Sequence, residues 1–200
     1  MKKLILLAVL MTPGISLCQV VTAANSVSFQ PLITRDAEGF SRCGVRIVVA
    51  SMEESQKSIA YDFSITMADD TFSLMKAGAY NVPFDRRSGW DITKMKPRLP
   101  APDSFWIAKR DDAATLKPTK YMKSEDPGFS MGGADGSMAA KILWAIAKQE
   151  PMQISLHYNG SKYDDVVAFQ ASLSTDDRAA FDACFAGMYK RMLSKMPKQK

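Results

Sequence analysis

The residues that could do chemistry in this chain are few. His157 is its only histidine, so a metal site built on several histidines is excluded. The residue lies on the polar side of an alternating segment beside Asn159-Gly160, where solvation is the simpler role and general-base catalysis the alternative. A hydrolase acting on an envelope polymer would need a serine or aspartate that only the fold can bring to His157.

Other catalytic patterns are missing from the sequence or weak. It has no Gly-x-Ser-x-Gly nucleophile elbow and no Asp-x-Asp-x-Asp-Gly calcium loop. Neighbouring carboxylates point to opposite faces of a strand, or cap and solvate turns and helix starts, so none makes a convincing dyad. These pairs are Glu53-Glu54, Asp69-Asp70, Asp111-Asp112, Asp164-Asp165 and Asp176-Asp177. We therefore predict no catalytic residue, metal or cofactor, and the balance leans against an enzyme.

A glycine-rich run, Gly132 to Ser137, leads into a helical segment. Its N–H groups could hold an anion, but it lacks the lysine and the spacing of a phosphate-binding loop. We interpret it as a flexible lead-in to the helix.

The strongest functional signal is a Pro-rich, basic loop region at 83–131. Between Arg86 and Lys123 the chain has ten basic and four acidic residues, a local net charge of +6. Cations and aromatic rings on a long loop can hold an anionic or glycan partner. The candidate binding residues are Arg86, Arg87, Trp90, Lys94, Lys96, Arg98 and Trp106. The alternative is that the tryptophans anchor the loop to the core and the cations are solvated.

The N-terminus is typical of a secretory signal peptide. Two lysines precede the apolar run from Leu4 to Met11, which is too short to span a bilayer, and small residues follow at Ala23-Ala24. We predict a signal peptide at 1–24, a periplasmic or secreted protein, and no transmembrane segment in the mature chain. Without Lys2 and Lys3 the net charge falls from +5 to +3, too mild a value to imply a nucleic-acid partner.

Two cysteines remain after this cleavage, Cys43 and Cys184. An even pair in an oxidising compartment favours a disulfide, while two buried free thiols are the alternative. The bond would close a loop across 141 positions and stabilise the fold by about 4–5 kcal/mol in the chain-entropy picture.

Alternating residues predict two hairpins. In the first, strands at 43–51 and 59–67 precede an Asp69-Asp70 turn that would set Met67 opposite Phe72 and Ile65 opposite Leu74. In the second, Asn159-Gly160 would be a two-residue turn. Strict pairing there would oppose Ile154 to Asp165, so we expect a bulge that returns Val166 or Val167 to the core.

Spacings of three and four predict two amphipathic helices. One covers Ser137 to Gln149, and the other begins at Ser174 and carries the apolar stripe Phe181, Cys184, Phe185, Met188. The fold class is therefore α+β: an antiparallel β-sheet or sandwich with two helices, one at the C-terminus, in a single domain at 25–200. This layout resembles small secreted β-rich accessory proteins such as the invasion-associated locus B group, and no residue role follows from it.

Together these features favour an exported, non-catalytic binding or accessory protein. Its partner would be another envelope or secreted protein, or an anionic envelope polymer. A structural subunit of an envelope or secretion assembly is the third hypothesis.

Overall fold

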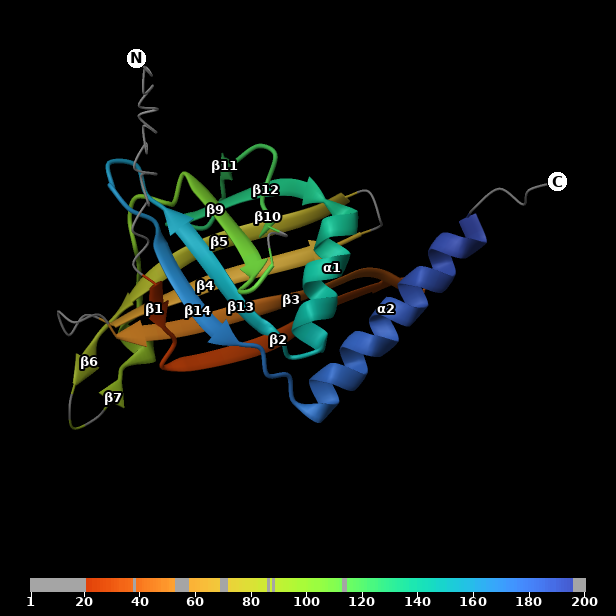
Figure 1. Ribbon diagram of the computed structural model, residues 1–200, viewed down its shortest axis with the longest axis horizontal. Helices are drawn as coiled ribbons and strands as arrows, with labels where there is room; N and C mark the ends of the chain where they lie inside the picture. Colours follow the sequence, from red (N-terminus) through yellow and green to blue (C-terminus); the bar gives the residue numbers. More distant parts are fainter. Residues whose placement is uncertain are drawn as a thin grey trace, which may run out of the picture.

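The computed structural model of the chain is a two-layer β-sandwich with helices beside the smaller sheet (Figure 1). It describes residues 21–37, 39–52, 58–68, 72–85, 87, 89–112 and 115–195. Residues 1–20, most of the predicted signal peptide, lie outside the described residues. The antiparallel sheets and the C-terminal helix confirm the predicted α+β class.

The larger layer is a seven-stranded sheet in the order β11-β12-β5-β4-β3-β2, with β8 paired to β5 off this path. Its strands are β2 (Ser26–Asp36), β3 (Gly39–Met52), β4 (Ser58–Met67), β5 (Phe72–Val82), β8 (Lys96–Pro97), β11 (Met122–Lys123) and β12 (Phe129–Asp135). Every pairing in it is antiparallel. Alternate residues such as Ile47 and Phe63 are fully buried on the face toward the smaller sheet.

The smaller layer is a five-stranded sheet in the order β1-β14-β13-β9-β10. Its strands are β1 (Val21–Ala23), β9 (Ser104–Lys109), β10 (Thr115–Leu116), β13 (Pro151–His157) and β14 (Asp165–Gln170). Ile107, Ile154 and Val167 share one rung and are fully buried. Phe105 meets Phe63 of the other sheet edge-to-face, with ring centroids 5.7 Å apart, so the core lies between the layers.

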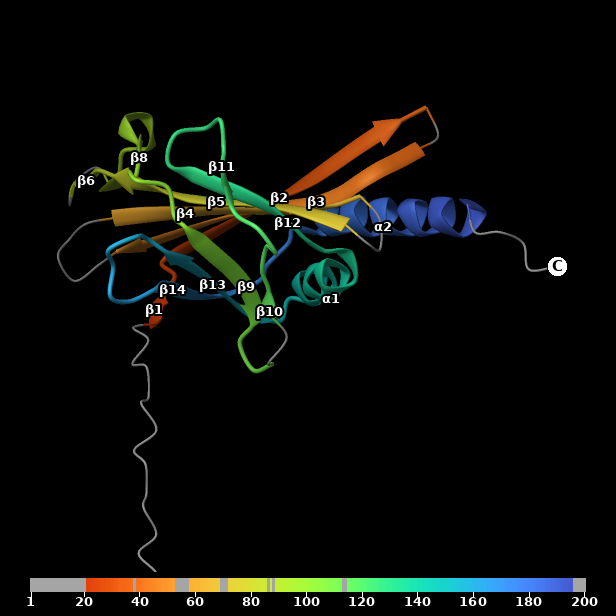
Figure 2. The same ribbon diagram turned by 90° about the horizontal axis from the view of Figure 1, so that it is seen from above.

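A small excursion follows β5 and stands at one end of the large sheet (Figure 2). It consists of a two-stranded ribbon, β6 (Phe84–Asp85) with β7 (Gly89–Trp90), and the 3₁₀ turn η1 (Ile92–Lys94). β8 then returns the chain to β5 through the pairs Tyr80↔Pro97 and Asn81↔Lys96.

Both predicted helices are present in the described part of the chain. α1 (Gly136–Ala147) is capped by Asp135, whose carboxylate accepts from the Met138 N–H at 2.7 Å. α2 (Thr175–Lys195) begins after Ser174, whose hydroxyl accepts from the Asp177 N–H at 3.1 Å. No helix among the described residues is long and apolar enough to cross a membrane.

The predicted disulfide joins Cys43 on β3 to Cys184 on α2, with Cα atoms 5.9 Å apart. Both cysteines are fully buried, and Phe181 and Met188 of the predicted stripe lie beside them in the same core. The disulfide therefore fixes α2 against β3 of the larger sheet.

The predicted register of the first hairpin is wrong by one residue. Met67 pairs with Ser73, and Ile65 pairs with Met75. A shift of one residue exchanges the two faces of a strand, so Phe72 is half exposed and Met75 takes the buried position. Asp69 and Asp70 of the predicted turn lie outside the described residues, and on either side of them the Ala68 N–H donates to the Phe72 carbonyl at 3.3 Å.

The second hairpin returns Val167 to the core, as predicted, but by a different route. Ile154 pairs with Val167 because the connection between the strands is longer, and the described ladder of β13 with β14 has no register shift. The turn places a positive φ of 85° at Gly160, and Ser161 donates to the Tyr158 carbonyl at 2.9 Å. The predicted turn at Asn159-Gly160 is therefore present, but it is part of a longer connection, and the described ladder does not have the predicted bulge near Asp164-Asp165.

The glycine-rich run is also not a flexible lead-in, because it forms β12. Gly132 and Gly133 pair with Met75 and Leu74 of β5. A Cβ on Gly132 would lie 2.2 Å from the Lys120 carbonyl oxygen, so only glycine lets these two segments approach.

β1 lies within the predicted signal peptide. Its residues 21–23 pair in parallel with Val166 to Ala168 of β14, and the Ala24 N–H donates to the Ala168 carbonyl at 3.1 Å. Cleavage after Ala23 or Ala24 stays a prediction, and it would leave β14 at the edge of the smaller sheet.

Replacing both cysteines, Cys43→Ala with Cys184→Ala, should lower the free energy of unfolding by about 4–5 kcal/mol, because the 141-residue separation then adds freedom to the unfolded chain. Denaturant unfolding of residues 20–200, which lack Cys18, measures this. Reductant should destabilise the wild type by a similar amount and leave the variant unchanged. A loss below about 1 kcal/mol would contradict the structural role of the bond.

Candidate functional site

The excursion after β5 borders a hollow of about 970 Å³. We call it the lysine hollow. It lies between the end of β5, the start of β6 and the η1–β8 segment, and it is lined by Ser58, Asn81, Val82, Pro83, Phe84, Thr93, Lys94, Met95 and Lys96. Phe84 is 36% exposed and Met95 39% exposed, so its wall presents apolar surface to solvent.

Trp90 holds the excursion in place. Its indole Nε1 donates to the Ser58 hydroxyl at 3.0 Å, and its ring meets Phe84 edge-to-face with centroids 6.3 Å apart. The Asp91 N–H donates to the Pro83 carbonyl at 3.0 Å. Trp90 therefore acts as an anchor that fixes the wall of the hollow, as the alternative interpretation of the tryptophans expected.

The two lysines of the hollow differ in their electrostatic surroundings. Lys94 is paired with Asp91, whose Oδ2 lies 2.9 Å from Nζ. Hydrogen bonds from Thr93 and Lys94 lower the pKa of Asp91 to about 2, and the Asp91 carboxylate in turn raises the pKa of Lys94. Lys96 is exposed at the rim of the hollow.

Arg98 lies elsewhere in the fold, at the joint between the two sheets. Its Nη1 lies 2.5 Å from Asp165 Oδ2 of β14, and its guanidinium carbon lies 4.3 Å from the Tyr158 ring centroid. The backbone N–H of Arg98 donates to the Ala79 carbonyl of β5 at 2.8 Å. Burial lowers the pKa of Arg98, but the charge of Asp165 and the Tyr158 hydroxyl outweigh it, so the pKa is raised. These contacts indicate a structural role.

The remaining candidate binding residues that the structure describes do not line the lysine hollow. Trp106 lies on β9 of the smaller sheet, opposite Ser155 of β13. Arg87 is exposed in the turn between β6 and β7, and Arg86 falls outside the described residues. Of the seven predicted binding residues, Lys94 and Lys96 line the hollow and Trp90 supports its wall.

His157 has a carboxylate partner. Its Nδ1 lies 2.8 Å from Asp164 Oδ1, and the Ser155 hydroxyl donates to the other oxygen of Asp164 at 3.2 Å. In a serine hydrolase the nucleophile would bond to the histidine, whereas here Ser155 bonds to the aspartate and is 1% exposed. Among the described residues, these hydrogen bonds give His157 an orienting partner, Asp164, and join Ser155 to that aspartate instead of to the histidine.

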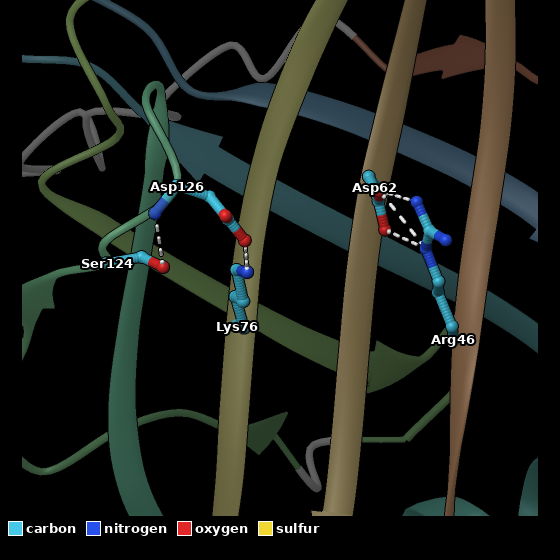
Figure 3. A network of polar contacts seen from close by, with 5 residues as sticks. All are labelled: Arg46, Asp62, Lys76, Ser124 and Asp126. Atoms are coloured by element: carbon cyan, nitrogen blue, oxygen red, sulfur yellow. Dashed lines mark hydrogen bonds and ion pairs between the residues drawn. The ribbon is translucent and has the colours of Figure 1, made fainter. Parts of the chain in front are cut away.

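A second polar cluster lies on the face of the large sheet that points away from the smaller one (Figure 3). Arg46 of β3 donates through Nε and Nη2 to Asp62 of β4, at 2.9 and 2.5 Å. Lys76 of β5 binds Asp126, whose N–H donates to the Ser124 hydroxyl at 3.3 Å. None of these residues was predicted as a candidate from the sequence, although Arg46, Asp62 and Lys76 are charged positions in alternating strands.

Comparison of the sequence with known proteins identifies no family for this chain. No protein-family model matches it, and no curated protein matches its sequence.

Replacing Arg98 with methionine should lower the free energy of unfolding by about 1–2 kcal/mol, because Asp165 is left partly buried without its cation. Lys96→Met, two residues earlier and exposed, is the matched control and should change stability by less than about 0.5 kcal/mol. Denaturant unfolding compares them, and equal effects would contradict the structural role of Arg98.

Tyr158→Phe should be neutral or stabilise the protein by up to about 1 kcal/mol, because the Tyr158 hydroxyl has no hydrogen-bond partner among the described residues. Burial raises the pKa of Tyr158 to about 12, partly opposed by Arg98. A raised pKa contributes stability below the unfolded pKa of about 10, which is lost as pH rises toward 12. The wild type should therefore lose more stability than the variant in alkaline denaturation, and parallel curves would contradict this.

Proposed function

We propose that this chain is an exported, non-catalytic accessory protein that binds another envelope or secreted protein through the lysine hollow. The observation that carries the proposal is the hollow itself, about 970 Å³ with apolar walls and lysines at its rim. A hollow of this kind can accept an apolar side chain of a partner while a neighbouring carboxylate of that partner meets Lys96.

The surroundings of the hollow support a protein partner. Ile92, which precedes Thr93 of the lining in sequence, is 69% exposed. Exposed apolar side chains close to a hollow extend the contact area beyond what a small molecule would use. The anchoring of Trp90 to Ser58 holds the wall before binding, which limits the entropy lost on association.

The charge of the region supports an acidic partner segment. Asp91 offsets Lys94, while Lys96 is exposed and positively charged. Exposed cations at a rim mainly raise the association rate, and salt screens their effect. An anionic envelope polymer would use these charges and leave the apolar wall unused, so the apolar wall favours a protein.

The hydrolase alternative has weaker support. The His157–Asp164 pair could orient a base, but Ser155 is directed to Asp164. None of the four hollows described is lined by His157.

The test is a pull-down from periplasmic extract with the oxidised protein at low and high salt, followed by mass spectrometry. We expect one stoichiometric protein whose binding weakens more than about 30-fold with Phe84→Ala and Met95→Ala combined, since both change the hollow's wall. Lys96→Glu should weaken binding about tenfold at low salt and less at high salt.

Matched controls come from α1, which lies at the opposite end of the molecule from β6 and β7 (Figure 1). Trp144→Ala removes an apolar side chain that is 56% exposed, and Lys141→Glu reverses an exposed charge. Both should bind the partner as the wild type does. Binding that is insensitive to salt, or that the hollow variants leave unchanged, would overturn the assignment of this site.

A further inference from the structure

The outward face of the large sheet is concave. At one end β2 and the start of β3 rise from the plane of the sheet, and at the other end β11, β6 and β8 stand above it (Figure 2). Between these margins lies a hollow of about 290 Å³ lined by Leu32, Arg46, Asp62, Ser64, Lys76, Tyr80, Asp126 and Phe129. This volume is near the lower limit of small-molecule sites, about 300 Å³.

The charges around this hollow alternate in sign. Arg46 and Asp62 form one ion pair, and Lys76 and Asp126 form the other (Figure 3). Arg46, Ser64 and Lys76 are neighbours on one rung of β3, β4 and β5, so the two cations stand on either side of the serine. The lining carries two positive and two negative charges.

The side chains of these two ion pairs still have hydrogen-bond donors and acceptors that a ligand could use. The fork from Arg46 to Asp62 uses Nε and Nη2, which leaves Nη1 to donate to another acceptor. The Lys76 ammonium has three N–H donors, and Asp126, whose side chain is 65% exposed, can accept more than one hydrogen bond. The Asp62 carboxylate raises the pKa of Arg46 further, so this cation persists at all physiological pH values.

Two aromatic rings complete the hollow. Tyr80 and Phe129 form a tilted pair with centroids 5.4 Å apart, and Lys76 Nζ lies 5.1 Å from the Phe129 centroid. The Phe129 ring lies over Gly78, where a Cβ would come within 2.7 Å of it. Phe129 is 5% exposed, so its ring holds the Lys76 ammonium in place, and the exposed side of Asp126 remains for a ligand.

From this arrangement we propose that the hollow binds a small zwitterion of the amino-acid class. The ligand's carboxylate would lie between Arg46 and Lys76, and its ammonium against the exposed side of the Asp126 carboxylate. A simple anion would meet Asp62 and Asp126 as well as the cations, and a simple cation would meet Arg46 and Lys76. A ligand with both charges meets an opposite charge at each end. This site is independent of the lysine hollow.

The test uses ω-amino acids as a ruler of charge separation. Glycine, β-alanine, 4-aminobutyrate, 5-aminovalerate and 6-aminohexanoate are titrated into the oxidised protein, and the amide resonances of Ser64 and Gly78 are followed by NMR. At least one member should give a saturable shift, because its length matches the separation of the two ends of the site. Acetate and methylammonium are the single-charge controls and should bind at least about tenfold more weakly.

Two variants localise the binding. Lys76→Met keeps the length of the side chain without its charge, and Asp126→Asn keeps its shape. Each should weaken the best zwitterion at least about tenfold, whereas Lys141→Met on α1 should not. Thermal unfolding confirms that the variants are folded. The proposal is overturned if no zwitterion gives a saturable shift, if acetate binds as well as the best zwitterion, or if both folded variants bind like the wild type.

Discussion

The mutual burial of the two inner sheet faces is the constraint on which the rest of this structure depends. Each strand of the sandwich alternates, so an apolar face is removed from water only when the sheets pack face to face. Phe63 and Phe105 meet in this layer, and the aliphatic rung of Ile107, Ile154 and Val167 lies on the same side. The disulfide then fixes α2 to the edge of that core.

This constraint also decides which groups remain for function. Once the inner faces are buried, charged residues of the strands are displayed on the outer faces, where Arg46, Asp62 and Lys76 meet on one concave surface. Segments that do not fit the alternation leave the sheet instead. The excursion from Phe84 to Lys96 does so and borders the lysine hollow, with Trp90 as the part that reaches back to β4.

Arg98 illustrates why composition alone is a poor guide to a binding site. In sequence it belongs to a run of cations with Lys94 and Lys96, and all three were predicted to bind. In the fold, the chain returns to the large sheet at β8, just before Arg98. The Arg98 guanidinium therefore packs against the Tyr158 ring and forms an ion pair with Asp165 of the smaller sheet. Lys96 is an exposed cation at the lysine hollow, whereas Arg98, two residues later, is partly buried and has a structural role.

The elements that are regular over many residues could be predicted from local patterns in the sequence. The strands at 43–51 and 59–67, both helices, the cap at Ser174 and the disulfide were predictable, because periodicity, capping and cysteine parity are local or compositional signals. Hairpin registers were not, since one residue more in a loop exchanges the faces of Phe72 and Met75. The glycine strand β12 was missed because glycines carry no alternation.

The sequence by itself therefore determined the α+β class, the core-facing residues of the longest strands and the closure of α2 onto β3. Only the tertiary structure decided which cations are exposed, which carboxylates they meet, and where hollows form. The physical reason is that both proposed sites depend on contacts between distant segments, such as Lys76 with Asp126 and Trp90 with Ser58, which no local pattern encodes.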